Sequence, residues 1–125
     1  MVNGLLDTAV LVDLLRAYPP AGDWLSRQSP LGVSPVVWLE IIEGAEDKRA
    51  QVRAIKLLQR FERIEVVTED FDWAIQQALR FRLSHNINMT DCLIASTAHR
   101  LNLPIFTTNL KHFHPLLGDL AQKPY

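Results

Sequence analysis

The 125-residue sequence has a single cysteine, Cys92, so it can form neither an internal disulfide nor a zinc site built from several cysteines. It also lacks an excess of charge of one sign, because 13 basic and 14 acidic residues leave a formal net charge of −1. A nearly neutral chain is not drawn as a whole to nucleic acid or to a membrane, so an anionic partner would need a local basic patch.

No stretch approaches the roughly 18 apolar residues of a membrane span, and the N-terminus lacks the features of a signal peptide. Internal repeats are missing, and the 7 prolines are spread along the chain rather than gathered in a linker. Apolar residues make up 48% and charged residues 22%, both near the globular average. We therefore expect residues 1–125 to form one cytoplasmic domain with its own core.

Short β-rich runs alternate with helical patterns along the chain. Strands are predicted at residues 4–6, 31–33, 64–67 and 105–107. Helices are predicted at residues 9–15, 21–27, 35–44, 47–61, from 68 to the loop at 86–88, and 90–101, and an irregular tail is expected from His112 onwards. Such alternation indicates parallel pairing, so we expect an α/β sandwich with a sheet of four or five strands.

Polar side chains predict where several of these helices begin. Thr8 and Thr68 are expected as N-caps, and Ser34 before Pro35 combines a cap with a proline at the first helical position. The helix that begins at Thr68 is expected to bury one face, formed by Phe71, Ala74, Ile75, Ala78 and Phe81.

Three acidic residues stand out because their neighbours are apolar. Asp7 ends the first predicted strand, Glu40 lies in a helix that is apolar nearly all round, and Asp91 shares a helical stripe with small apolar residues. A buried carboxylate is costly unless it is paired or bound to a cation. Each also has an ordinary interpretation: a helix cap for Asp7 and Asp91, and a solvent-facing edge for Glu40. Glu43, near the end of its helix, is the acid expected to face solvent.

Thr107, Thr108 and Asn109 follow the last predicted strand, where they either form a polar turn or join a site. In parallel α/β folds, sites gather beyond the carboxyl ends of the strands. Three carboxylates with hydroxyl and amide oxygens are hard ligands that suit Mg²⁺ or Mn²⁺ rather than zinc. Such a site could orient a phosphodiester and activate water, and one or two ions would fit the ligand count.

Four segments, in order and at matching spacing, resemble the motifs of PIN-domain ribonucleases. The segments are LLDTAVLVDLL at residues 5–15, WLEIIEG at 38–44, TDCLIASTA at 90–98 and LPIFTTNLKHF at 103–113. They resemble, in turn, the family's opening strand and helix, its acidic helix, its third acidic motif and its closing strand and turn. The resemblance covers nearly the whole chain, and the size and closing motif are similar to VapC-type toxins of toxin–antitoxin pairs.

The resemblance implies a PIN-like three-layer sandwich and RNA cleavage that depends on Mg²⁺ or Mn²⁺. It also implies a homodimer and a cognate antitoxin protein that blocks the site. Residue by residue, Asp7, Glu40 and Asp91 match the family's metal-binding acids, with Thr8 and Thr107 as supporting hydroxyls. In the implied reaction, metal-activated water attacks the scissile phosphorus, and Asp91 or Glu40 accepts its proton.

The closing motif departs from the family at the fourth acidic position. Many members carry an aspartate there, whereas Asn109 and His112 occupy the candidate places in this chain. Asn109 can still be a metal ligand through its carbonyl oxygen, or hold a water molecule. It removes one negative charge, so a second ion should bind more weakly.

Basic side chains at spacings of 4, 3, 4 and 3 residues form one stripe: Arg49, Arg53, Lys56, Arg60 and Arg63. The stripe could follow an RNA backbone or receive an acidic antitoxin tail, although a charged stripe is more often a solvated face. Lys111 and His112 lie beside the proposed site, where contact with phosphate is plausible.

The leading hypothesis is an endoribonuclease that acts as the toxin of a type II toxin–antitoxin system. The alternative is a catalytically weak PIN-like module that binds RNA or antitoxin, and Asn109 lends it some support; metal-dependent turnover would separate the two. A phosphatase or phosphotransferase is disfavoured because no second acid follows Asp7 two residues on. DNA stays open as a substrate, because an acid cluster alone does not distinguish the sugars.

Overall fold

The computed structural model describes residues 1–125 and contains one sheet of five parallel strands in the order β3-β2-β1-β4-β5. Each strand is two residues long: β1 Leu5–Leu6, β2 Gly32–Val33, β3 Glu62–Arg63, β4 Ile105–Phe106 and β5 Ala121–Gln122. The parallel pairing and the strand number confirm the predicted α/β architecture.

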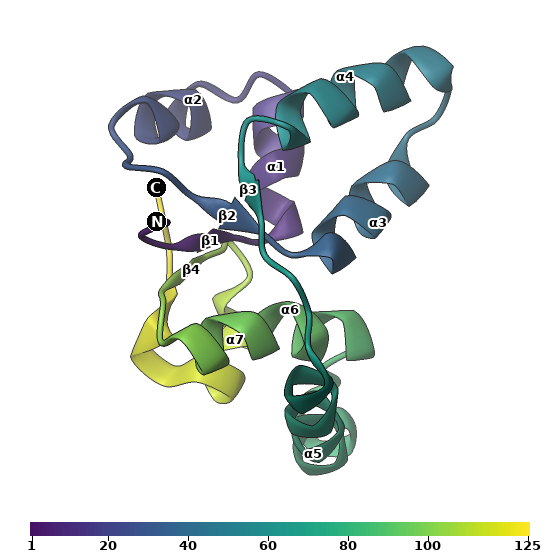
Figure 1. The fold of residues 1–125 in the computed structure, drawn as a ribbon, viewed down its shortest axis with the longest axis vertical. Helices are drawn as coiled ribbons and strands as arrows, with labels where there is room; N and C mark the ends of the chain where they lie inside the picture. The colour runs from purple at the N-terminus through teal and green to yellow at the C-terminus, as the bar shows by residue number, and fades with distance from the viewer.

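Seven α-helices flank the sheet in two layers, as Figure 1 shows. Their bounds are α1 Thr8–Leu15, α2 Pro19–Ser26, α3 Pro35–Gly44, α4 Lys48–Leu58, α5 Thr68–His85, α6 Met89–Leu101 and α7 Leu110–Leu117. Helices α1 to α4 pack together on one side, and α5 to α7 pack together on the other. None of the helices combines the length and apolar character that crossing a bilayer requires.

The strand order creates a switch point beside β1. From β1 the chain first winds outwards through β2 to β3, then crosses back to β4 on the other side of β1 and continues to β5. Helices therefore leave neighbouring strands toward opposite faces, which opens a crevice at the carboxyl ends of β1 and β4. The fully buried side chains of Leu6, Val10 and Ile105 fill the core directly beneath this edge.

The third strand lies earlier in the chain than predicted. It pairs at Glu62 and Arg63, opposite Gly32 and Val33, rather than at residues 64–67. Both paired residues are exposed, because β3 is an edge strand. The prediction was wrong because the residues after β3 are apolar and resemble a strand. Ile64 adds one hydrogen bond, from its N–H to the carbonyl of Val33, and no strand pairing continues past Ile64.

Helix α4 ends at Leu58, three residues before the predicted end, so Arg60 and Arg63 of the basic stripe lie beyond the helix. Two predicted caps are also shifted by one residue. Asp7, not Thr8, caps α1, and its carboxylate accepts from the Thr8 N–H. Val67, not Thr68, precedes α5. Ser34 caps α3 as predicted and accepts from the Val36 N–H.

Helix α5 buries only part of the predicted face. Ala74 is buried and both Ala78 and Phe81 are partly buried, but Phe71 and Ile75 are 50% and 58% exposed. The helix carries apolar residues on two sides, and only one of them faces α6. Sequence periodicity could not indicate which side packs.

The C-terminal tail is ordered rather than irregular. Helix α7 extends through Pro115 and buries Phe113 and Leu116 against the core. Gly118, with φ of 58°, ends the helix, and a short 3₁₀ turn leads into β5. Burial of the apolar face of α7 outweighs the helix-breaking tendency of the proline.

An ion pair joins the start of α5 to the end of α6. Asp70, only 1% exposed, accepts from Arg100 Nε at 2.9 Å and from the Val67 N–H at 3.0 Å. The guanidinium also donates to the backbone carbonyl of Glu65 at 3.0 Å. A buried carboxylate that loses its cation keeps its desolvation cost, so the two helices depend on this contact.

Replacing Arg100 should destabilise the fold. We expect Arg100→Met to lower the free energy of unfolding by about 2–4 kcal/mol, because the Asp70 carboxylate stays buried with only one remaining donor. The matched control is Arg63→Met, whose pair with Glu65 is exposed on both sides and should contribute less than about 1 kcal/mol. Urea denaturation measures both, and equal losses in the two variants would contradict the assigned role of Arg100.

Candidate functional site

Asp7 and Thr107 meet at the carboxyl ends of neighbouring strands. The β1–β4 register pairs Leu5 with Ile105 and Leu6 with Phe106, so the next residues, Asp7 and Thr107, face one another. Thr107 Oγ1 donates to Asp7 Oδ2 at 2.7 Å, and the Thr8 N–H donates to Asp7 Oδ1 at 2.7 Å. Both side chains are buried, so this contact lies inside the edge of the core.

Glu40 reaches the same edge from α3. Thr8 Oγ1, in the first turn of α1, donates to Glu40 Oε1 at 2.6 Å and links the two helices. Glu40 is partly buried, whereas Glu43 on the same helix is exposed, as predicted. The second carboxylate oxygen of Glu40 accepts no hydrogen bond from the protein, so it is free to contact a ligand.

Asp91 enters from the first turn of α6. Asn88 caps this helix by accepting from the Asp91 N–H at 2.9 Å, and the Thr90 hydroxyl donates to the same Asn88 oxygen at 2.7 Å. The Asp91 carboxylate lies 3.0 Å, from Oδ2 to Nδ1, from the His112 ring. Asp91 is 8% exposed, so its carboxylate lies in the wall of the crevice.

The departures from the family's closing motif lie within this network. The Asn109 N–H donates to Thr107 Oγ1 at 2.9 Å, and the Asn109 side-chain amide lies 3.1 Å from His112 Nδ1. When His112 Nδ1 carries a proton, it can donate a hydrogen bond to Asp91. When it carries none, it can accept one from the Asn109 amide. It cannot make both hydrogen bonds at once. Asn109 and His112 thus connect the acid on α6 to the hydroxyl beside Asp7.

The crevice is unfavourable for negative charge. Burial raises the pKa of Asp7 to about 6; the hydrogen bond from Thr107 opposes this rise, and the charges of Asp91 and Glu40 add to it. Burial likewise raises the pKa of Asp91, the contact with His112 lowers it, and Glu40 raises it. The three carboxylates therefore act on one another electrostatically although they come from distant parts of the sequence.

The donor chemistry of the site fits a hard divalent cation. Asp7, Glu40, Asp91 and the Asn109 carbonyl offer only oxygen ligands, which Mg²⁺ and Mn²⁺ prefer. No three His, Cys, Asp or Glu side chains stand at ligand distance around one point in this arrangement. Thr8 and Thr107 donate hydrogen bonds to oxygens of Glu40 and Asp7, so ligation of one ion by all three acids would require their side chains to rotate.

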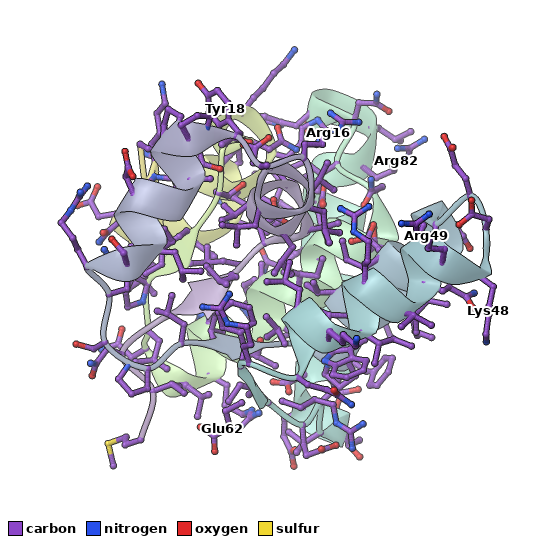
Figure 2. All side chains as sticks on the ribbon, turned by 90° about the horizontal axis from the view of Figure 1, so that it is seen from above. Arg16, Tyr18, Lys48, Arg49, Glu62 and Arg82 are labelled. Atoms are coloured by element: carbon purple, nitrogen blue, oxygen red, sulfur yellow. The ribbon has the colours of Figure 1, made fainter.

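A groove of about 780 Å³ leads away from the site between α1, α3 and α4. Thr8 and Glu40 lie at one end, and the apolar residues Val12, Leu15 and Ile41 are part of its lining. Three arginines also line it: Arg16, Arg49 and Arg53. In Figure 2, Arg16 and Arg49 lie toward the same side of the molecule, whereas Lys48 points outwards.

The structure separates the predicted basic residues into two groups. Arg49 and Arg53 line the groove, while Lys56, on the same helix, is exposed outside it. Arg53 also donates to the carbonyl of Leu15 at 2.9 Å, which ties α4 to α1. Lys111 is exposed on α7, one residue before His112.

Two residues of this region were missed by the sequence prediction. Asn88 positions the helix start that carries Asp91, and asparagine is one of the residues favoured as a helix N-cap. Arg16 follows an apolar helix as an isolated cation, and no sequence pattern links it to Arg49. Only the packing of α1 against α4 brings it to the groove.

Comparison with known proteins identifies the family. The family model of the PIN domain matches residues 4–114 of the chain. The chain belongs to the PIN-domain family. Ribonuclease VapC10 of Mycobacterium tuberculosis is 36% identical to this PIN domain over 93% of the chain and 89% of its own length. Ribonuclease VapC19 of the same organism is 32% identical over 97% of the chain and 98% of its own length.

The fold is shared with solved structures. A chain in a toxin–antitoxin complex from Klebsiella pneumoniae matches this PIN domain with a TM-score of 0.81 at 24% identity, covering 98% of both chains. The five-stranded parallel sheet flanked by seven helices is therefore the PIN fold, as the sequence resemblance implied.

Neutralising Asp7 should stabilise the metal-free PIN domain at neutral pH. The folded-state pKa of about 6 lies above the ordinary value of 3.8, so ionisation of Asp7 destabilises the folded state. This penalty is absent below about pH 4, grows up to about pH 6 and is complete above it. With chelator present, Asp7→Asn should gain about 1–2 kcal/mol near pH 7.5 and lose that gain near pH 4.

Urea denaturation at the two pH values measures this effect, with Asp119→Asn as the control because Asp119 is an exposed acid outside the site. A loss of stability in Asp7→Asn near pH 7.5 would mean that the hydrogen bonds from Thr8 and Thr107 outweigh the cost of burying the charge.

Proposed function

We propose that this PIN domain, residues 1–125, is a divalent-metal-dependent endoribonuclease that acts as the toxin of a type II toxin–antitoxin pair. The observation that carries the proposal is the meeting of Asp7, Glu40 and Asp91 at one edge of the sheet, where their charges act on one another. Two relatives named as ribonucleases, each more than 30% identical over nearly the whole chain, support the same activity.

Mg²⁺ or Mn²⁺ is the proposed cofactor, held by Asp7, Glu40 and Asp91 with the Asn109 carbonyl as a further ligand. A divalent ion there would neutralise the carboxylates, polarise the phosphodiester and lower the pKa of a water molecule. Asn109 carries no charge, so the proposal expects one ion to bind firmly and a second to bind weakly.

The protein's own side chains hold the acids and take up the proton. Thr107 and the Thr8 N–H fix Asp7, and the Thr8 hydroxyl fixes one oxygen of Glu40 while leaving the other free. Asp91 has one oxygen on His112 and one that accepts no hydrogen bond from the protein. Asp91 or Glu40, each of which has one carboxylate oxygen free of protein hydrogen bonds, is the proposed base for the attacking water.

The proposal includes a cognate antitoxin as a protein partner and RNA as the substrate. A structural relative was solved as a toxin–antitoxin complex, which supports a partner of this kind. A cytoplasmic location is part of the proposal, because RNA is present there and the single cysteine needs no oxidising compartment. A homodimer is expected from the resemblance and stays a prediction.

Cleavage of RNA tests the proposed activity. Antitoxin-free protein should cut a mixed pool of structured RNAs with Mg²⁺ or Mn²⁺ and fail to do so with chelator. Asp91→Asn and Glu40→Gln should each lose at least about 100-fold in rate, because each removes an acid of the site. Glu43→Gln is the matched control, since Glu43 lies on the same helix but is exposed, and it should keep the full rate.

Two outcomes would count against this proposal. Cutting that survives in Asp91→Asn would come from a contaminating nuclease or from another site. No cutting with either ion, by protein with a normal circular dichroism spectrum, would favour the module that binds RNA or antitoxin without cleavage. In that case Asn109→Asp would show whether the missing charge is the reason.

The groove should bind the RNA backbone through Arg49 and Arg53. Arg49→Gln and Arg53→Gln should each raise KM for RNA by about three- to tenfold with little change in kcat, and weaken the dependence of KM on salt. Lys56→Gln is the matched control, because Lys56 lies on the same helix outside the groove. An equal effect in all three variants would indicate general surface charge, and no effect in any would exclude the groove from substrate binding.

A further inference from the structure

The three acids at the sheet edge are held in a similar way, but not by the same kind of donor. Asp7 and Glu40 each accept a hydrogen bond from a threonine hydroxyl. Asp91 meets no hydroxyl. Its carboxylate instead contacts the ring of His112, with 3.0 Å between Oδ2 and Nδ1. The histidine therefore stands where the other two acids have a threonine.

The backbone fixes the place of His112. The residue lies in the first turn of α7, directly before Phe113, whose side chain is fully buried. Its N–H donates to the carbonyl of Asn109 at 3.2 Å, and α7 packs against α6, which carries Asp91. The side chains of His112 and Asp91 are only 24% and 11% exposed, so water screens the contact between them only in part.

The contact uses one particular nitrogen of the ring. Nδ1 of His112 lies 3.0 Å from the Asp91 carboxylate and 3.1 Å from the side-chain amide of Asn109. A hydrogen bond to a charged carboxylate is stronger than one with a neutral amide, so Asp91 selects the ring state in which Nδ1 carries a proton. A nitrogen that donates to Asp91 has no lone pair left for an ion, so His112 cannot be a metal ligand through Nδ1.

We propose that His112 is a positioning residue, which holds Asp91 Oδ2 through Nδ1 and leaves Oδ1 free to act in the site. The closing motif of this chain thus orients an acid of the site instead of adding a further acid. This role differs from the phosphate contact considered from the sequence, because the contact atom faces Asp91. The effect on the reaction rests on the proposed function, whereas the contact itself does not.

NMR of the full chain with isotopically labelled histidine tests the contact. With chelator present, Nδ1 of His112 should carry a proton, and Asp91→Ala should remove this preference because the acceptor is gone. His114 is the internal control, because it is exposed on the same helix and its ring should not respond. Thermal melts establish that the variant folds. A proton found only on Nε2 of His112 in the wild-type chain overturns the proposal, and so does a signal that Asp91→Ala leaves unchanged.

Two substitutions separate the two nitrogens of the ring. The amide nitrogen of asparagine stands two bonds from Cβ, as Nδ1 does, whereas that of glutamine stands three bonds away, as Nε2 does. Positioning through Nδ1 predicts that His112→Gln lowers kcat for RNA about tenfold with little change in KM, and that His112→Asn recovers most of this loss. His114→Gln is the matched control and should keep the wild-type rate.

Calorimetric titration with Mn²⁺ in the absence of RNA gives a readout other than activity. His112→Gln should bind Mn²⁺ about tenfold more weakly than His112→Asn does, because Asp91 is no longer held. Rescue by glutamine instead of asparagine, or a change in KM alone, overturns the proposal and assigns His112 to phosphate contact through Nε2. Equal rates and equal binding in the two variants overturn it as well. A wild-type chain that binds no Mn²⁺ contradicts the proposed function, and the NMR experiment then decides the contact by itself.

Discussion

The site depends on one buried contact, the hydrogen bond from Thr107 to Asp7. An ionised carboxylate inside an apolar core is costly, and two donors, the Thr107 hydroxyl and the Thr8 N–H, offset that cost. Thr107 can reach Asp7 only if β1 and β4 end at the same level, as their register makes them do. The position of Asp7 therefore depends on the alignment of β1 with β4.

The other acids are held by residues next to this contact. Thr8 follows Asp7 and fixes Glu40, while Thr107 accepts from Asn109, whose side chain lies against His112. The links are hydroxyl and amide groups and one imidazole, and no lysine or arginine is hydrogen-bonded to the three acids. Burial of the carboxylates, with a smaller contribution from their mutual repulsion, raises the pKa values of Asp7 and Asp91. Positive charge at this edge would stabilise the ionised carboxylates. A bound ion or a cationic group of a partner can supply it.

The sequence predicted the gathering of the three acids better than it predicted the details of the fold. Asp7, Glu40 and Asp91 are charged residues in apolar surroundings, and such local inconsistency is visible without a structure. The position of β3 was predicted wrongly, and the buried face of α5 was right only in part. In both places several apolar residues could have been buried, and only packing decides among them. Asn88 is an intermediate case. Asparagine is a favoured N-cap residue, which the sequence shows, but the contact of Asn88 with Asp91 depends on where α6 begins, and only the structure gives that residue.

Helix α6 shows how stability and chemistry share the same elements. At one end, Asn88 caps its first turn and His112 contacts Asp91. At the other end, Arg100 binds the buried Asp70 at the start of α5. Contacts at both ends of α6 therefore position Asp91.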